Sequence, residues 1–90
     1  MDLAELRAEI DCIDEELIRL FIRRMEVCAR VAAYKKDHNL PILMPEREQE
    51  KLLDVARKAG PEMGDYTKRL YTLLFELSRD HQIKQNEVTP

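Results

Sequence analysis

The sequence predicts an all-α chain of three helices, the first of them very long, that assembles into an intertwined helical homodimer. Alanine, leucine, glutamate, lysine and arginine dominate the composition, whereas glycine occurs only twice and aromatic residues make up 6% of the 90 residues. These residue types favour helices and leave few formers of turns or strands. Proline and glycine are also absent from residues 2–37, so no breaker interrupts a helix there.

The first helix is expected over residues 1–37, beginning near Asp2, whose side chain is an acceptable N-cap. At a rise of 1.5 Å per residue this helix spans roughly 54 Å, whereas a compact domain of the same length has a radius of gyration of about 12 Å. A rod of that length cannot fold back on itself. We therefore expect its middle to pack against the same helix of a second copy, with the two helices antiparallel.

The second helix is short and follows a connector at residues 38–44, which contains an asparagine and a proline as breakers. We expect this helix over residues 45–59. Pro45 suits the first helical position, where a missing N–H costs nothing, and the acidic side chains that follow favour a helix N-terminus. Gly60 and the proline after it end the helix.

The third helix is expected over residues 65–84, with a polar tail at residues 85–90. Its buried stripe consists of Leu70, Leu73, Leu74 and Leu77. The chain is of a length typical of one small domain, so residues 1–90 are expected to form a single domain.

The net charge and the positions of the cysteines exclude some classes of partner and some kinds of cross-link for this protein. The net charge is −3 and no dense basic run is present, which argues against a nucleic-acid partner. Cys12 and Cys28 are sixteen positions apart on one predicted helix, roughly 24 Å, which is too far for a disulfide within the chain. We expect reduced thiols in a cytoplasmic protein, with neither a leader peptide nor a membrane span.

Apolar residues recur along the first helix in alternating steps of three and four, the spacing of a coiled-coil stripe. The stripe comprises Leu3, Leu6, Ile10, Ile13, Leu17, Leu20, Val27, Val31 and Tyr34. Arg24 occupies a position on the same stripe. Burying a guanidinium is costly unless an anion meets it, so Arg24 indicates either an anion-binding site or a pair with an acidic neighbour across the dimer.

Helix geometry relates two other cationic residues of the first helix to Arg24. Lys35 differs from Arg24 by about 20° around the helix and lies about 16 Å along it, so both side chains can close on one small anion. Arg7 is roughly 25 Å from Arg24 along the helix and cannot reach that anion within its own chain. In an antiparallel dimer, however, Arg7 of one protomer approaches the Arg24 end of the other.

Two polar pairs lie on the other helices. Arg47 and Glu48 fall in the first turn of the second helix, where free backbone amides favour an oxygen ligand. Ser78 and Gln82 are four positions apart beside the apolar stripe of the third helix. Without a nucleophile or a metal-ligand cluster, these groups suit a dicarboxylate that is held rather than attacked. Taken singly, each of them also fits a solvated helix surface.

Several segments together closely resemble the all-helical chorismate mutases. They are LRAEIDCIDEELIRLFIRR, a lysine eleven positions after its last arginine, PILMPEREQE and LLFELSRDHQ. The similarity covers about residues 3–83. It implies an enzyme that converts chorismate to prephenate, a step towards phenylalanine and tyrosine, as an intertwined dimer without a cofactor or a metal.

The resemblance also implies a role for each candidate residue. Arg24 resembles the buried arginine that clamps a substrate carboxylate, Lys35 and Gln82 the two contacts to the ether oxygen, and Glu48 the acceptor of the ring hydroxyl. We expect these four to be catalytic as well as substrate-binding.

Three more residues are expected to bind substrate: Arg7, given across the dimer, Arg47, near a carboxylate, and Ser78, a small polar contact. Met44 departs from the family, which often has an aspartate before this Pro-Glu-Arg-Glu segment. Losing a side-chain cap costs about 0.5 to 2 kcal/mol of local stability.

Other functions remain compatible with the sequence. Isochorismate pyruvate lyases share this fold and cationic pocket, so that activity is an alternative. A non-catalytic dimerisation or regulatory module is a further alternative, and docking onto another enzyme of the aromatic pathway is compatible with each of these functions.

Overall fold

The prediction of an all-α chain with three helices is confirmed. The computed structural model describes residues 2–41 and 43–88, and over these residues it contains helices α1 (Leu3–Asp37), α2 (Pro45–Ala59) and α3 (Gly64–Val88) and no strand. The parts of the predicted first helix, connector and tail that fall on residues 1, 42, 89 and 90 lie outside the described residues.

Hydrogen bonds of nearby residues define both ends of α1. The carboxylate of Asp2 accepts a hydrogen bond of 2.8 Å from the backbone N–H of Glu5, which caps the helix. At the other end the backbone N–H of His38 donates to the carbonyl of Tyr34, and Asn39 takes a left-handed conformation with φ 56°. α1 is therefore one continuous helix of 35 residues.

A tight turn joins α2 to α3. Gly60 ends α2 with φ 88°, a value that side chains resist. Gly64 begins α3 and is buried against α2, since a Cβ built there would lie 3.2 Å from the carbonyl oxygen of Ala56. Gly60 thus permits the turn, and Gly64 permits the close approach of α3 to α2.

The far end of α3 corrects the expected polar tail. Residues 85–88 are helical, so α3 ends at Val88 rather than at Lys84. Polarity alone does not stop a helix: glutamine and glutamate are good helix formers, and the next breaker is Pro90. At its start α3 begins one residue before the expected Asp65.

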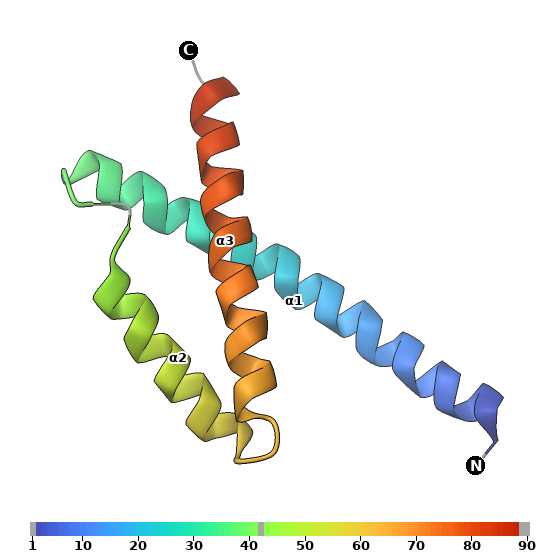
Figure 1. Cartoon of the computed structure of the whole chain (residues 1–90). Helices are drawn as coiled ribbons and strands as arrows, with labels where there is room; N and C mark the ends of the chain where they lie inside the picture. Colours follow the sequence, from blue (N-terminus) through green and yellow to red (C-terminus); the bar gives the residue numbers. More distant parts are fainter. Residues whose placement is uncertain (1, 42, 89–90) are drawn as a thin grey trace.

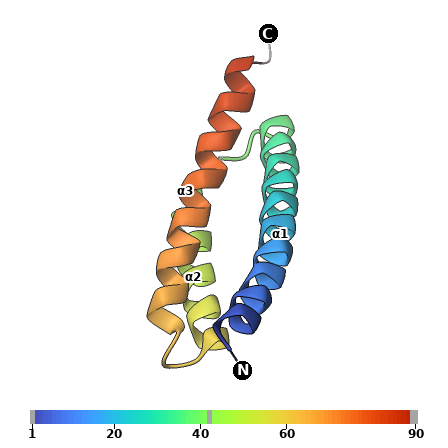
Figure 2. The same cartoon turned by 90° about the vertical axis from the view of Figure 1, so that its right-hand side faces the viewer.

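The three helices form two layers. α3 contacts both α1 and α2, and it crosses α1 near the middle of that helix (Figure 1). Figure 2 shows α1 on one side and the α2–α3 pair on the other. The first half of α1 projects beyond both other helices, and the chain measures 54 × 31 × 15 Å with a radius of gyration of 16.4 Å. A compact chain of this length would have a radius near 12 Å.

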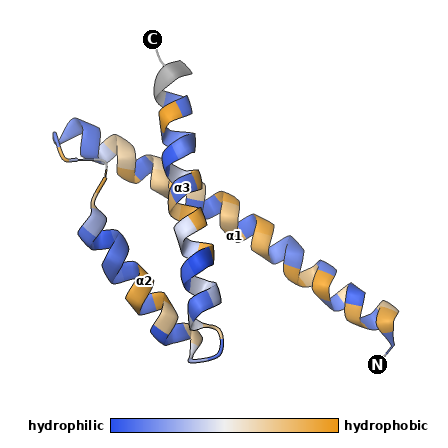
Figure 3. Cartoon of the chain, viewed as in Figure 1, coloured by the Kyte–Doolittle hydropathy of each residue, from blue (hydrophilic) through white to orange (hydrophobic). Residues whose placement is uncertain are grey.

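The apolar stripe of α1 is left uncovered in a single chain. Ile13, for example, is 63% exposed, and Leu3, Leu6 and Ile10 are exposed as well. Apolar residues recur along the projecting half of α1 (Figure 3, orange). Exposed apolar surface on this scale marks a contact surface. Within the described residues, none of the helices is long and apolar enough to cross a membrane.

Candidate active site

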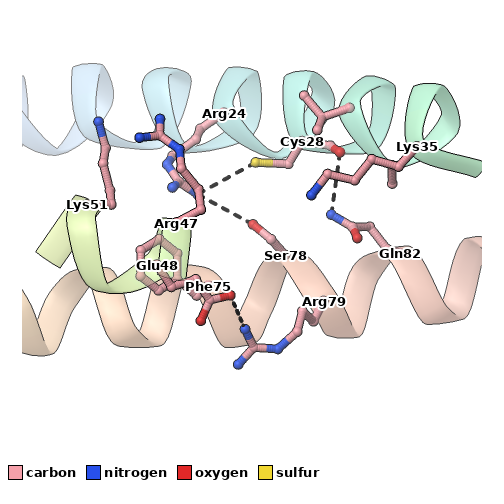
Figure 4. A pocket seen from close by; sticks show the side chains of 12 residues that line it. Arg24, Cys28, Lys35, Arg47, Glu48, Lys51, Phe75, Ser78, Arg79 and Gln82 are labelled. Atoms are coloured by element: carbon pink, nitrogen blue, oxygen red, sulfur yellow. Dashed lines mark hydrogen bonds and ion pairs between the residues drawn. The ribbon is translucent and has the colours of Figure 1, made fainter. Parts of the chain in front are cut away.

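One cavity of about 270 Å³ lies where the C-terminal half of α1 meets the start of α2 and the C-terminal half of α3 (Figure 4). Its volume is close to the lower end of the roughly 300 to 1,000 Å³ usual for small-molecule sites. All three helices line it. Six of its lining residues are ones that the sequence singled out: Arg24, Lys35, Arg47, Glu48, Ser78 and Gln82.

Arg24 is held in this cavity by neutral groups. Its Nη1 donates to the hydroxyl of Ser78 at 3.4 Å and to the sulfur of Cys28 at 3.7 Å. The guanidinium carbon also lies 5.6 Å from the ring centre of Tyr71 and 5.9 Å from that of Phe75, within cation–π range. Over the described part of the chain, none of the ion pairs involves Arg24. Its positive charge is thus oriented but is not neutralised by a carboxylate among the described residues.

Ser78 orients Arg24 from beneath. The residue is 7% exposed, and its hydroxyl donates to the sulfur of Met25 at 3.6 Å while accepting from Arg24. Because both its donor and one acceptor position are used, the hydroxyl has a fixed direction. The serine that helical spacing placed beside the apolar stripe is therefore a contact of Arg24.

Lys35 and Gln82 line the other end of the cavity (Figure 4). The side-chain nitrogen of Gln82 donates to the backbone carbonyl of Cys28 at 3.4 Å, which links α3 to α1 and sets the amide plane. An amide nitrogen carries two N–H groups, so one of them stays available to a ligand. This end of the cavity thus combines a positive charge with a neutral hydrogen-bond donor.

The first turn of α2 forms another wall of the cavity. Arg47 is 66% exposed at its side chain and makes only a long contact of 4.0 Å to Glu50, so its guanidinium is largely solvated. Glu48 is more enclosed, and its Oε2 accepts from Nη1 of Arg79 at 2.6 Å. As expected, Met44 precedes this turn without a side-chain capping bond.

The sequence reasoning missed two cationic residues of the cavity, Lys51 and Arg79. Lys51 follows Arg47 by four positions and so shares its helix face, a signal that was available in the sequence. Arg79 reaches from α3 to α2, a contact that no local spacing predicts. With both included, five cationic side chains and one carboxylate line the cavity of a chain whose net charge is −3.

Arg7 is not brought to this cavity. It lies on the projecting first half of α1 and is absent from the lining residues of its own chain. Over residues 2–41 and 43–88, no cluster of three or more side chains suited to a metal ion is found. The cavity therefore gathers six of the candidate residues, with three cations, a hydroxyl, an amide and one carboxylate, while the seventh lies elsewhere.

The chain is similar in sequence to several known proteins. The chain is 48% identical over 85 residues to the T-protein of Haemophilus influenzae, covering 94% of this chain and 22% of that protein. It is 51% identical over 49 residues to a bifunctional chorismate mutase/prephenate dehydratase of Aquifex aeolicus, covering 54% of this chain and 14% of that protein.

A 4-amino-4-deoxychorismate mutase of Streptomyces pristinaespiralis is 31% identical over 80 residues, covering 86% of this chain and 62% of that protein. The chain spans about a fifth of the length of the T-protein that it matches. No solved structure gives a significant match. The family model described as chorismate mutase type II matches residues 6–83, and the chain therefore belongs to the type II chorismate mutase family.

Proposed function

We propose that this chain converts chorismate to prephenate. The reaction is a unimolecular 3,3-sigmatropic rearrangement in which one C–O bond breaks as one C–C bond forms, so every atom of the substrate stays in the product. The observation that carries the proposal is the guanidinium of Arg24, which forms no ion pair within the described part of the chain, in a cavity lined by five cationic side chains. Such a cavity suits a small dianion, and the reaction needs no nucleophile, acid or base.

Catalysis then follows from position and charge. Arg24, Arg47 and the partner protomer's copy of Arg7 hold the two carboxylates, so that the enolpyruvyl arm lies over the ring before the barrier is reached. Lys35 and Gln82 donate to the ether oxygen, where negative charge grows as the C–O bond breaks. Preorganised donors of this kind are typically worth about 3 to 4 kcal/mol each.

Glu48 and Ser78 complete the site. Glu48 accepts a hydrogen bond from the ring hydroxyl, and Ser78 acts mainly by fixing the direction of Arg24, since its hydroxyl is already engaged with Met25. We expect Ser78 to affect catalysis through that arginine.

The active form that we propose is an antiparallel homodimer. Two observations support it: the stripe of α1 is exposed in the single chain, and an apolar groove of about 480 Å³ lies between α1 and α3. Leu17, Phe21, Leu70 and Leu74 are among the residues lining that groove. A partner helix laid on these surfaces would bury them and bring its own Arg7 towards the cavity.

Two other substrates need to be distinguished from chorismate. The Streptomyces relative is named for 4-amino-4-deoxychorismate, which carries an amino group where chorismate has its ring hydroxyl. Isochorismate, the substrate of pyruvate lyases, is the third candidate. The pairing of Glu48 with Arg79 favours the hydroxyl compound, because the carboxylate is already matched by a positive charge.

Location and association are further proposals. We place the chain in the cytoplasm, where its two thiols stay reduced. Some relatives join a chorismate mutase to a prephenate dehydratase in one polypeptide. We therefore propose a second enzyme of the same pathway as a binding partner of this chain.

The decisive assay is the loss of chorismate absorbance on adding the purified chain, with prephenate measured as the product. We expect turnover of chorismate and at most a trace of pyruvate release from isochorismate. A bicyclic dicarboxylate mimic of the transition state should also raise the thermal midpoint, since at 100 times its dissociation constant it adds about 2.7 kcal/mol. A chain that turns over none of the three substrates and gains no stability would be a scaffold, contrary to the proposal.

A further inference from the structure

The contact between Arg79 and Glu48 differs from an ordinary surface ion pair. The two atoms are 2.6 Å apart, and the side chains are 38% and 30% exposed. The pair of Arg57 with Asp54, by contrast, lies within α2 and joins residues three positions apart. The Arg79 pair links α3 to α2 and lies at the wall of the cavity, where both residues are lining residues.

This contact sets the charge that a ligand meets at Glu48. The bond from Arg79 reaches Oε2, and a carboxylate has a second oxygen with lone pairs that can accept another hydrogen bond. A neutral hydroxyl can donate there without opposing Arg79. An ammonium group in the same place would face a carboxylate whose charge is already matched, together with four other cationic side chains around the cavity.

We propose that Arg79 is a positioning residue that makes the site select a ring hydroxyl over an amino group at the position facing Glu48. This inference rests on the proposed function, in which Glu48 receives that substituent. An amine on a saturated carbon is largely protonated near neutral pH. Arg79 thus disfavours the amino substrate by charge, without touching either substrate.

The test compares kcat/KM for chorismate and for 4-amino-4-deoxychorismate in the chain of residues 1–90. Arg79→Met keeps an unbranched stem, although a shorter one, and removes the charge, and we expect it to shift the ratio of the two values at least about tenfold towards the amino substrate. Arg79→Lys keeps the charge and should hold the ratio within about threefold of wild type. Circular dichroism checks that the methionine variant is folded. If it is not, Arg79→Gln serves as a second neutral variant.

A double-variant cycle separates selection from simple damage to the fold. In a Glu48→Gln background Arg79 loses the carboxylate that holds it at the wall of the cavity, so Arg79→Met should move the ratio less than it does in the wild-type background. An equal fall of both kcat/KM values in the neutral Arg79 variants would overturn the inference, as would a lysine variant that behaves like the methionine one. A wild-type chain that turns over neither substrate would instead overturn the proposed function, and this inference with it.

Discussion

Two inactive variants of this chain should restore each other's activity when they are mixed. Arg7 and Arg24 are seventeen positions apart on α1, which separates them by roughly 25 Å along its axis. In a mixed dimer of Arg7→Ala with Lys35→Ala, the intact pocket of the first chain receives Arg7 from the second. Equal amounts give half mixed dimers, each with one of two sites, so about a quarter of wild-type activity should return.

The matched control is a mixture of Arg24→Ala with Lys35→Ala. Both substitutions damage the pocket of their own chain, so a mixed dimer holds no complete site and should stay inactive. Chorismate turnover is measured after subunit exchange has been verified, for example by native mass spectrometry of a mass-tagged chain. Absence of recovery in the first mixture, or recovery in the control, would refute a site shared between two chains.

Three single substitutions test the remaining assignments. Lys35→Ala should lower kcat by roughly a hundredfold or more because a donor to the ether oxygen is lost, whereas Cys12→Ser, an exposed position outside the cavity, should leave kcat nearly unchanged. Ile13→Asp places a charge in the middle of the exposed stripe and should convert dimer to monomer in analytical ultracentrifugation, with loss of activity; an active monomer would contradict the dimer. Met44→Asp should supply the missing cap of α2 and raise the free energy of unfolding by about 0.5 to 2 kcal/mol in urea denaturation, and an unchanged midpoint would show that the cap is not limiting.

The helices could be predicted because their signals are local. Asp2, Asn39, Pro45 and Gly60 act on the backbone within a few residues, and the helix boundaries near them lie where the sequence placed them. The predicted end of α3 was wrong. Gln85 and the polar residues after it were interpreted as a tail, although none of them breaks a helix before Pro90. Polarity predicts exposure, and exposure is compatible with helix.

The site was predictable to the extent that it follows helical phase. Arg24 with Lys35 and Ser78 with Gln82 share faces that any continuous helix produces, and the structure gathers them around one cavity. Arg79 was missed because its contact depends on how α3 lies against α2, which no periodicity encodes. The place of Arg7 depends on a second chain, so neither helical phase nor a single protomer decides it.

The charge of the cavity links function to assembly. Five cationic side chains close to one another repel, and one carboxylate offsets only part of that repulsion. A dianion bound in the cavity would offset this repulsion, so the cationic groups that repel one another in the free protomer are those that we propose bind its ligand. The exposed apolar stripe of α1 behaves in the same way, because its contact with water is unfavourable in free energy and its burial against a partner would be stabilising. Both features are unfavourable in the isolated protomer, and substrate and a second copy would each remove one of them.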